Sequence, residues 1–201
     1  HLGDSFASSK TVQMIEEEFN KLDTSKPIKN LGVWLFEIFT NINTAIYEES
    51  LRNENLKGMG TTLSGIVVVN NEMYYAHIGD SRIYTFNERD LQQITTDHTY
   101  VNTLLLNGLI TFKQALKHPK RHVLTNALGI KKNVSVDIGQ IRLKEDEGIL
   151  ITTDGLHNLL DGKKLIKLLN EPLTTQEKVD LLVNKALDLG GNDNITLILL
   201  E

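Results

Sequence analysis

The chain has 201 residues, 40% of them hydrophobic and 23% charged, which is the composition of a folded domain with a substantial core. Its 21 basic and 26 acidic residues give a net charge of -5 with no basic block, which argues against nucleic-acid binding. The absence of cysteine excludes disulfides, thiolate zinc sites and a cysteine nucleophile, and it fits a cytoplasmic protein.

The first part of the chain has the apolar spacing of two helices. Val12, Ile15 and Phe19 recur at helical intervals, which predicts an amphipathic helix that buries them on one face. Apolar residues recur at the same period over residues 31–53, so a second helix is predicted there.

The middle of the chain changes to the pattern of β-strands. Residues 63–69 and 73–78 are apolar and β-branched, and Asn70-Asn71 between them tolerates the positive φ angles of a tight hairpin. Residues 83–86 and 91–94 have the pattern of a second hairpin. Together these segments predict an antiparallel meander.

The last part of the chain mixes strands with helices. Strands are predicted at residues 134–143, 149–151 and 195–200. Thr174 to Glu177 is a capping box that starts a helix, and the inner face of this helix is predicted to extend to Leu187. Because helices and strands occur in separate runs, we expect an α+β fold with helices packed on antiparallel sheets, in one domain covering residues 1–201.

Four aspartates stand where apolar runs end: Asp80, Asp97, Asp154 and Asp193. Burying an unpaired carboxylate costs several kcal/mol, roughly, so four such residues near core strands need a common explanation. Binding of hard divalent cations, which prefer oxygen ligands, would provide one. If the strands before Asp154 and Asp193 are neighbours, these two carboxylates can bind one Mg²⁺ or Mn²⁺. Taken singly, an aspartate in an Asp-Gly or Asp-Asn pair is more often a turn or helix-cap residue than a cation ligand.

Six short motifs occur in a fixed order along the chain. They are Gly60-Thr61-Thr62, Ala76-His77-Ile78-Gly79-Asp80-Ser81-Arg82, Thr96-Asp97-His98-Thr99, Val123-Leu124-Thr125-Asn126-Ala127-Leu128-Gly129, Thr153-Asp154-Gly155-Leu156 and Gly191-Asn192-Asp193-Asn194-Ile195-Thr196. From about residue 58 to 200, this series resembles the bacterial form of the metal-dependent Ser/Thr protein phosphatases of type 2C.

The resemblance implies an α-β-β-α sandwich of two antiparallel sheets flanked by helices, with two bound Mg²⁺ or Mn²⁺ ions and a weaker third. Asp154 and Asp193 match the ligands of the first ion, and Asp97 matches a ligand of the third. Asp80 and Arg82 belong to a motif that we interpret as structural. Residues 102–121 match a flap that influences substrate choice.

The chain departs from the family pattern in two ways. The first strands of the family are missing, and with them the phosphate-binding and metal-bridging residues, so the catalytic residues are unknown here and expected upstream of His1. Asn158 stands where bacterial members commonly have a third-metal aspartate. The 201-residue chain taken literally is therefore expected to be a poor catalyst.

Two functions follow from these observations. The leading hypothesis is a protein phosphatase that hydrolyses phosphoserine and phosphothreonine with a metal-activated water, acting in the bacterial cytoplasm on the substrates of a Ser/Thr kinase. The alternative is an inactive pseudo-phosphatase that binds a phosphoprotein as a regulatory module. No membrane partner is expected, because no apolar stretch approaches the ~20 residues of a membrane helix.

Overall fold

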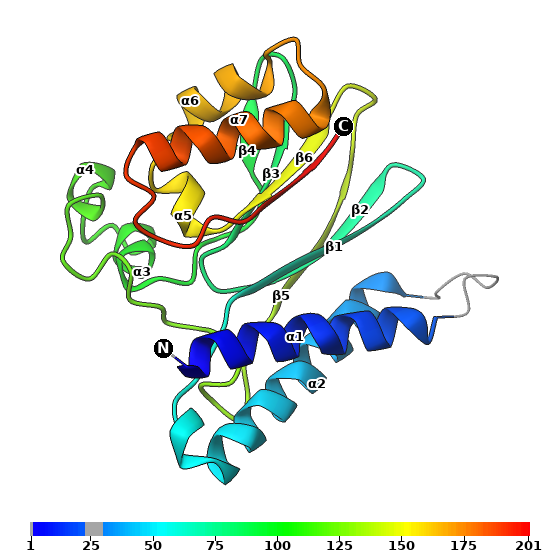
Figure 1. Cartoon of the computed structure of the whole chain (residues 1–201), viewed down its shortest axis with the longest axis vertical. Helices are drawn as coiled ribbons and strands as arrows, with labels where there is room; N and C mark the ends of the chain where they lie inside the picture. The colour runs from blue at the N-terminus through cyan, green and yellow to red at the C-terminus, as the bar shows by residue number, and fades with distance from the viewer. Residues whose placement is uncertain (1, 23–29) are drawn as a thin grey trace. The chain divides into compact units, whose positions relative to one another are not determined.

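The computed structural model describes residues 2–22 and 30–201 (Figure 1), so the expectation about residues before His1 lies outside the described part. Contacts divide the chain into two compact units. The first contains the residues up to Gly79 together with His98–Arg142, and the second contains Asp80–Asp97 and Leu143–Glu201. Each unit has its own antiparallel sheet and its own helices, which confirms the predicted class of helices combined with two antiparallel sheets.

The sheet of the first unit has the order β1-β2-β5. Its strands are β1 (Leu63–Val69), β2 (Glu72–Ile78) and β5 (Asp137–Arg142), all paired antiparallel. The predicted hairpin is confirmed: Asn70 and Asn71 have φ angles of 50° and 63°, and Val69 pairs with Glu72 on either side of them.

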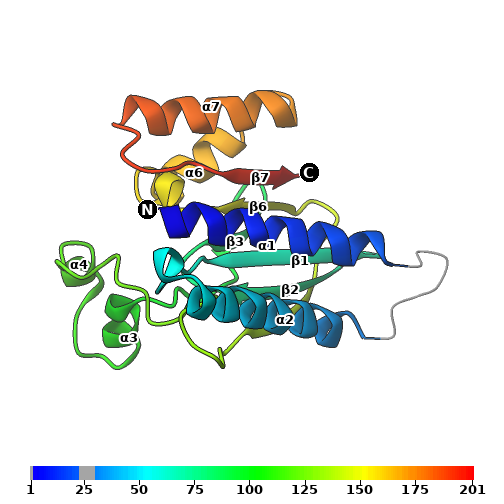
Figure 2. The same ribbon diagram turned by 60° about the horizontal axis from the view of Figure 1, so that its bottom comes forward.

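Helices α1 (Leu2–Asn20) and α2 (Leu31–Arg52) lie side by side, and α2 packs against β2 and β5 (Figure 2). The turn η1 (Glu54–Leu56) and the short helices α3 (Tyr100–Leu106) and α4 (Phe112–Ala115) complete the unit. Helix α2 begins at the predicted place, because the Asn30 side chain accepts a hydrogen bond from the Val33 amide. Its buried side includes Leu35, Ile38, Ile42 and Ile46.

The predicted buried face of α1 is wrong in part. Val12 and Phe19 are 65% and 60% exposed, whereas Ala7 and Thr11 are buried. Ile15 does pack against the core, together with Met14. The apolar spacing of this segment therefore does not by itself identify the side of α1 that is covered.

The sheet of the second unit has the order β4-β3-β6-β7, again with antiparallel pairing. Its strands are β3 (Arg82–Phe86), β4 (Leu91–Gln93), β6 (Gly148–Thr152) and β7 (Leu197–Leu200). The predicted four-strand meander is therefore wrong, because β2 and β3 belong to different sheets. Gly79 separates them with a φ of +110°, a value that side-chain-bearing residues rarely adopt.

Helices α5 (Asp154–His157), α6 (Gly162–Leu169) and α7 (Thr175–Asp188) belong to the second unit, where α7 packs against α5, α6 and β7. The capping box of Thr174 and Glu177 is confirmed. Leu182 and Ala186 of α7 are buried, but Leu187 is 54% exposed, so the predicted inner face of this helix extends too far. None of the helices in residues 2–22 and 30–201 has both the length and the apolar character needed to cross a membrane.

Candidate active site

Asp154 and Asp193 stand beside the ends of two neighbouring strands. β6 and β7 are paired, with Thr152 opposite Leu197. The pairing continues past the strand ends, because the Thr153 amide donates to the carbonyl of Thr196 at 3.0 Å and the Thr196 amide donates to Thr153 Oγ1 at 3.0 Å. The segments that carry the two aspartates are thus held together by hydrogen bonds next to Asp154.

Gly155 shows how closely these segments approach each other. A Cβ at this position would lie 2.2 Å from the carbonyl oxygen of Asn194. Gly155 follows Asp154, and Asn194 follows Asp193, so the backbone that holds one aspartate touches the backbone that holds the other. This close approach requires glycine, since any side chain would separate the two segments.

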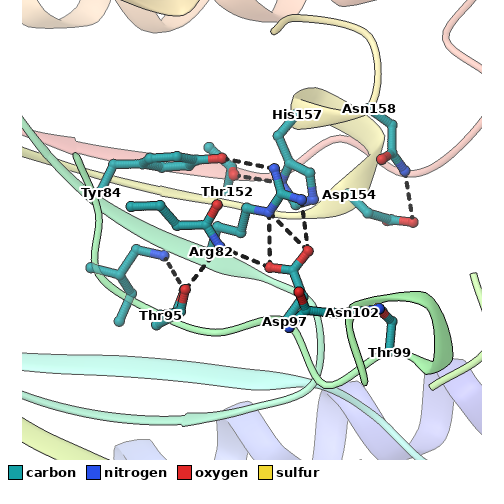
Figure 3. Close-up of polar contacts among 12 residues, drawn as sticks. Arg82, Tyr84, Thr95, Asp97, Thr99, Asn102, Thr152, Asp154, His157 and Asn158 are labelled. Carbon is teal, nitrogen blue, oxygen red and sulfur yellow. Dashed lines mark hydrogen bonds and ion pairs between the residues drawn. The ribbon is translucent and has the colours of Figure 1, made fainter. Parts of the chain in front are cut away.

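Both carboxylates have amide groups as neighbours. Asp193 is exposed, and its Oδ1 accepts a hydrogen bond from the Asn194 amide at 2.7 Å. Asp154 begins α5, and its Oδ2 accepts a long 3.4 Å bond from Asn158 Nδ2 (Figure 3). Asn158, where the family commonly has an acid, therefore donates a hydrogen bond to Asp154 instead of adding a negative charge.

Asp97 is held by Arg82, which Figure 3 shows pointing at its carboxylate. Arg82 Nε lies 2.9 Å and 3.1 Å from the two carboxylate oxygens, and Arg82 Nη2 lies 2.6 Å from Oδ2. Gln93 Nε2 also donates to Asp97 Oδ1 at 2.9 Å, and Arg82 Nη1 donates to the Tyr84 hydroxyl at 3.1 Å. The structure thus places Asp97 in an ion pair with several hydrogen bonds.

The charges of this group are strongly fixed. Burial alone would lower the pKa of Arg82, but the hydrogen bonds and charge of Asp97 outweigh it and raise that pKa. Burial raises the pKa of Tyr84, so its phenol stays neutral. The guanidinium of Arg82 therefore stays positively charged beside Asp97.

Asp80 shares its motif with Arg82, whose ion pair is with Asp97. Burial, followed by the negative charges of Asp154 and Asp97, raises the pKa of Asp80 to about 6. Three of the four predicted aspartates are therefore close enough to influence one another electrostatically. All three lie in the second unit.

His157 is a buried residue that the sequence analysis did not single out. Its Nδ1 lies 2.8 Å from Thr152 Oγ1 (Figure 3), and burial together with the charge of Arg82 lowers its pKa to about 3. The ring is therefore neutral at pH 7. The available signal was a histidine three residues after Asp154.

The segment 102–121 includes most of α3 and all of α4. It leaves several large apolar side chains exposed: Leu106, Leu109, Phe112 and Leu116. Lys113, Lys117, Lys120 and Arg121 lie in the same segment. Next to it, the rings of Tyr100 and His118 are 5.8 Å apart, and Lys120 Nζ lies 5.4 Å from the centre of the Tyr100 ring.

The oxygen donors around Asp154 suit a hard divalent cation. Mg²⁺ commonly uses only one or two protein carboxylates and retains several waters. Burial is the main cause of the raised pKa of Asp80, and the negative charges of Asp154 and Asp97, which add to it, are ones that such a cation would offset. Within residues 2–22 and 30–201, no three His, Cys, Asp or Glu side chains form a metal-holding cluster by themselves.

Comparisons with known proteins identify the family of the chain. The family model described as protein phosphatase 2C matches residues 2–188. The serine/threonine phosphatase stp of Listeria monocytogenes serotype 4b is 31% identical over 201 residues, which is 100% of this chain and 80% of the relative.

Two solved structures have the same fold. Serine/threonine phosphatase Stp1 from Staphylococcus aureus matches with a TM-score of 0.91 and 33% identity, over 96% of this chain and 76% of that one. The catalytic domain of serine threonine protein phosphatase PstP, solved with two manganese ions, matches with a TM-score of 0.84 and 29% identity, over 97% of this chain and 80% of that one. The chain therefore belongs to the protein phosphatase 2C family, whose members are metal-dependent serine/threonine protein phosphatases.

Proposed function

We propose that this chain is the phosphatase that its family predicts and that it hydrolyses phosphoserine and phosphothreonine in proteins, with Asp154 and Asp193 holding a divalent cation. The observation that carries the proposal is the close contact of Gly155 with Asn194 on the adjacent ends of β6 and β7. When bound, the cation would offset the negative charge of the phosphate ester and activate water for hydrolysis.

The residues of the chain have separate parts in this proposal. Asp154 and Asp193 hold the cation, and the Asn158 amide orients Asp154 without competing for the cation. Arg82 keeps Asp97 in place and is itself neutralised, so Arg82 is not assigned to phosphate binding. The manganese ions of the PstP structure make Mn²⁺ the first cation to test, with Mg²⁺ as the alternative.

Asp97 is proposed as a ligand of a third and weaker cation. Both of its oxygens already accept hydrogen bonds from Arg82, and one accepts another from Gln93. A cation at this position must displace part of that pair, and Asn158 adds no charge to attract it. We therefore propose that this position fills only at cation concentrations well above those that fill the Asp154 and Asp193 position.

The proposed substrates are phosphoproteins made by a bacterial Ser/Thr kinase. The segment 102–121 is proposed to influence substrate choice, because it exposes apolar side chains beside four basic ones. Such a surface suits a peptide that combines an apolar side chain with negative charge.

The test measures phosphate release from a phosphothreonine peptide and from p-nitrophenyl phosphate with Mn²⁺, using the protein expressed from its natural start codon. Asp154→Ala and Asp193→Ala should each lower turnover at least about 100-fold, since each removes a ligand of the cation. Asp180→Asn, which changes an exposed acid on α7, should leave turnover unchanged. Equal activity in Asp193→Ala and the wild type would contradict the proposal.

A non-catalytic phosphoprotein-binding role is the second candidate. The observation in its favour is that the described residues form no cluster of three metal-ligating side chains. It predicts that the protein binds a phosphopeptide in calorimetry but releases no phosphate from it at any Mn²⁺ concentration. Turnover that depends on Asp193 would exclude this role.

A further inference from the structure

Two chain segments of the first unit are joined by a reciprocal pair of hydrogen bonds. The backbone amide of His98 donates to the carbonyl oxygen of Gly79 at 2.7 Å. In return, the amide of Gly79 donates to His98 Nδ1 at 3.1 Å. We call this pair of bonds the Gly79–His98 clasp. It closes the base of the segment 80–97, which starts with Asp80 and ends with Asp97.

The His98 ring is fixed in one orientation and one tautomer. Because Nδ1 accepts from Gly79, the ring proton is assigned to Nε2, which donates to Asp137 Oδ2 at 3.0 Å. Asn126 Nδ2 lies 3.4 Å from Nδ1 and also donates to the carbonyl of Ser135 at 2.6 Å. The His98 side chain is only 14% exposed, whereas its partner Asp137 is 44% exposed.

The backbone on both sides of the clasp has little freedom to move. The Thr125 amide donates to the carbonyl of His98 at 2.8 Å, so His98 is bonded through its amide, its carbonyl and its ring. Gly79 has a φ of +110°, and a Cβ there would lie 2.3 Å from Thr62 Cγ2. The clasp thus joins two positions that are already fixed by their surroundings.

We propose that His98 is a positioning residue: through the clasp it fixes the backbone next to Asp97 and so preorganises the Asp97 carboxylate for the weaker cation position. His98 itself touches neither cation nor substrate. The inference rests on the proposed function, because that proposal assigns Asp97 to the weaker cation. Removing the support of a metal-binding group typically weakens metal affinity about 10–100-fold.

The two ring nitrogens of His98 bond to different partners, Nδ1 to Gly79 and Nε2 to Asp137, so each bond can be tested separately. His98→Phe fills the space but removes both bonds. His98→Asn retains an oxygen close to the place of Nδ1, so it can still accept from Gly79, but it cannot reach Asp137. Ser64→Ala is a matched control: it removes the 2.8 Å bond from Ser64 Oγ to His77 in the same buried layer and leaves the clasp intact.

The experiment measures Mn²⁺ affinity at the weaker position, as the second step of a calorimetric titration below the melting temperature of every variant, and amide hydrogen exchange at Gly79 in the metal-free protein. His98→Phe should weaken this second step of Mn²⁺ binding at least tenfold and accelerate exchange at Gly79 by a similar factor. His98→Asn should recover Mn²⁺ affinity to within about threefold of the wild type. Ser64→Ala should match the wild type in both measurements.

Wild-type Mn²⁺ affinity in His98→Phe would overturn the inference, and so would a His98→Asn variant that binds as poorly as His98→Phe. If His98→Phe does not fold, Asp137→Ala replaces it, because that change removes the other support of the ring and should weaken Mn²⁺ binding in the same direction. Failure of the proposed function gives a different result: the wild type itself would bind no Mn²⁺, while the exchange at Gly79 would still report on the clasp.

Discussion

Replacing Gly155 by alanine should separate Asp154 from Asp193 with the smallest possible change. The added Cβ would lie 2.2 Å from the carbonyl oxygen of Asn194 and 2.9 Å from its carbonyl carbon, whereas ordinary contacts begin near 3.4 Å. Because both opposing atoms belong to the backbone, the segment after Asp193 must move by more than 1 Å. Overpacking of this kind costs about 1–3 kcal/mol of folding stability.

The effect on activity should exceed the effect on stability. A displacement of about 1 Å in a positioning group can lower turnover about 100-fold. We expect Gly155→Ala to stay folded, to bind Mn²⁺ at least tenfold more weakly and to lose about two orders of magnitude in phosphate release. The assays are thermal melting, calorimetric titration of Mn²⁺ and turnover of p-nitrophenyl phosphate.

Gly162→Ala is the matched control for this experiment. A Cβ there meets only Leu91 Cδ2 at 3.7 Å, an ordinary contact, and the residue begins α6. Alanine should therefore be neutral or stabilise the helix by up to about 1 kcal/mol, with unchanged Mn²⁺ affinity. The reasoning is refuted if Gly155→Ala keeps more than half of the wild-type turnover and affinity.

Three further predictions concern the second unit. Arg82→Met removes the guanidinium that pairs with Asp97 and leaves this partly buried carboxylate without its positive partner, which should destabilise the protein by about 3 kcal/mol in urea unfolding. The double variant Arg82→Met/Asp97→Asn should recover at least half of that loss. If it recovers none, the ion pair is not the cause. His157 has its pKa lowered to about 3 in the folded state, so the unfolded chain binds more protons below pH 6.5 and stability falls as the pH falls. Between pH 7 and pH 5 this residue should account for about 2 kcal/mol, and His157→Gln should show a correspondingly smaller loss of stability; an unchanged pH dependence would contradict the buried neutral ring. Thr174→Ala removes the cap of α7 and should lower the free energy of unfolding by about 1 kcal/mol without affecting Mn²⁺ binding, whereas a loss of 0.2 kcal/mol or less would show that the capping box contributes little.

The features that were predictable from the sequence are those set by neighbouring residues. The Asn70-Asn71 hairpin, the helix that follows Asn30 and the capping box at Thr174 each depend on a few consecutive side chains, and all three are confirmed. Asp154 and Asp193 could be singled out for the same reason, because Asp154 lies shortly after one short apolar strand and Asp193 shortly before another. Their assignment as cation ligands stays a prediction.

The features that the sequence did not predict depend on pairing between distant segments. Residues 73–78 and 83–86 have the same strand pattern whether they pair with each other or enter different sheets, and only the backbone at Gly79 separates the two outcomes. Likewise, helical spacing placed Val12 on a buried face because it is apolar, although the structure buries Ala7 and leaves Val12 exposed. Periodicity gives the spacing of a face but not the neighbour that covers it.

The ion pair of Arg82 with Asp97 is the clearest example of a contact that the sequence did not predict. It also determines the order in which the proposed cation positions should fill. Arg82 is two residues from Asp80, yet its guanidinium bonds to Asp97, since β3 and the segment after β4 bring the two side chains together. A cation that uses Asp97 must compete with a guanidinium that already satisfies both carboxylate oxygens, whereas at Asp193 the bond from the Asn194 backbone amide is compatible with a cation on the same carboxylate. Raising the Mn²⁺ concentration should therefore fill the Asp154 and Asp193 position first, and Asp97→Asn should leave that first binding step unchanged.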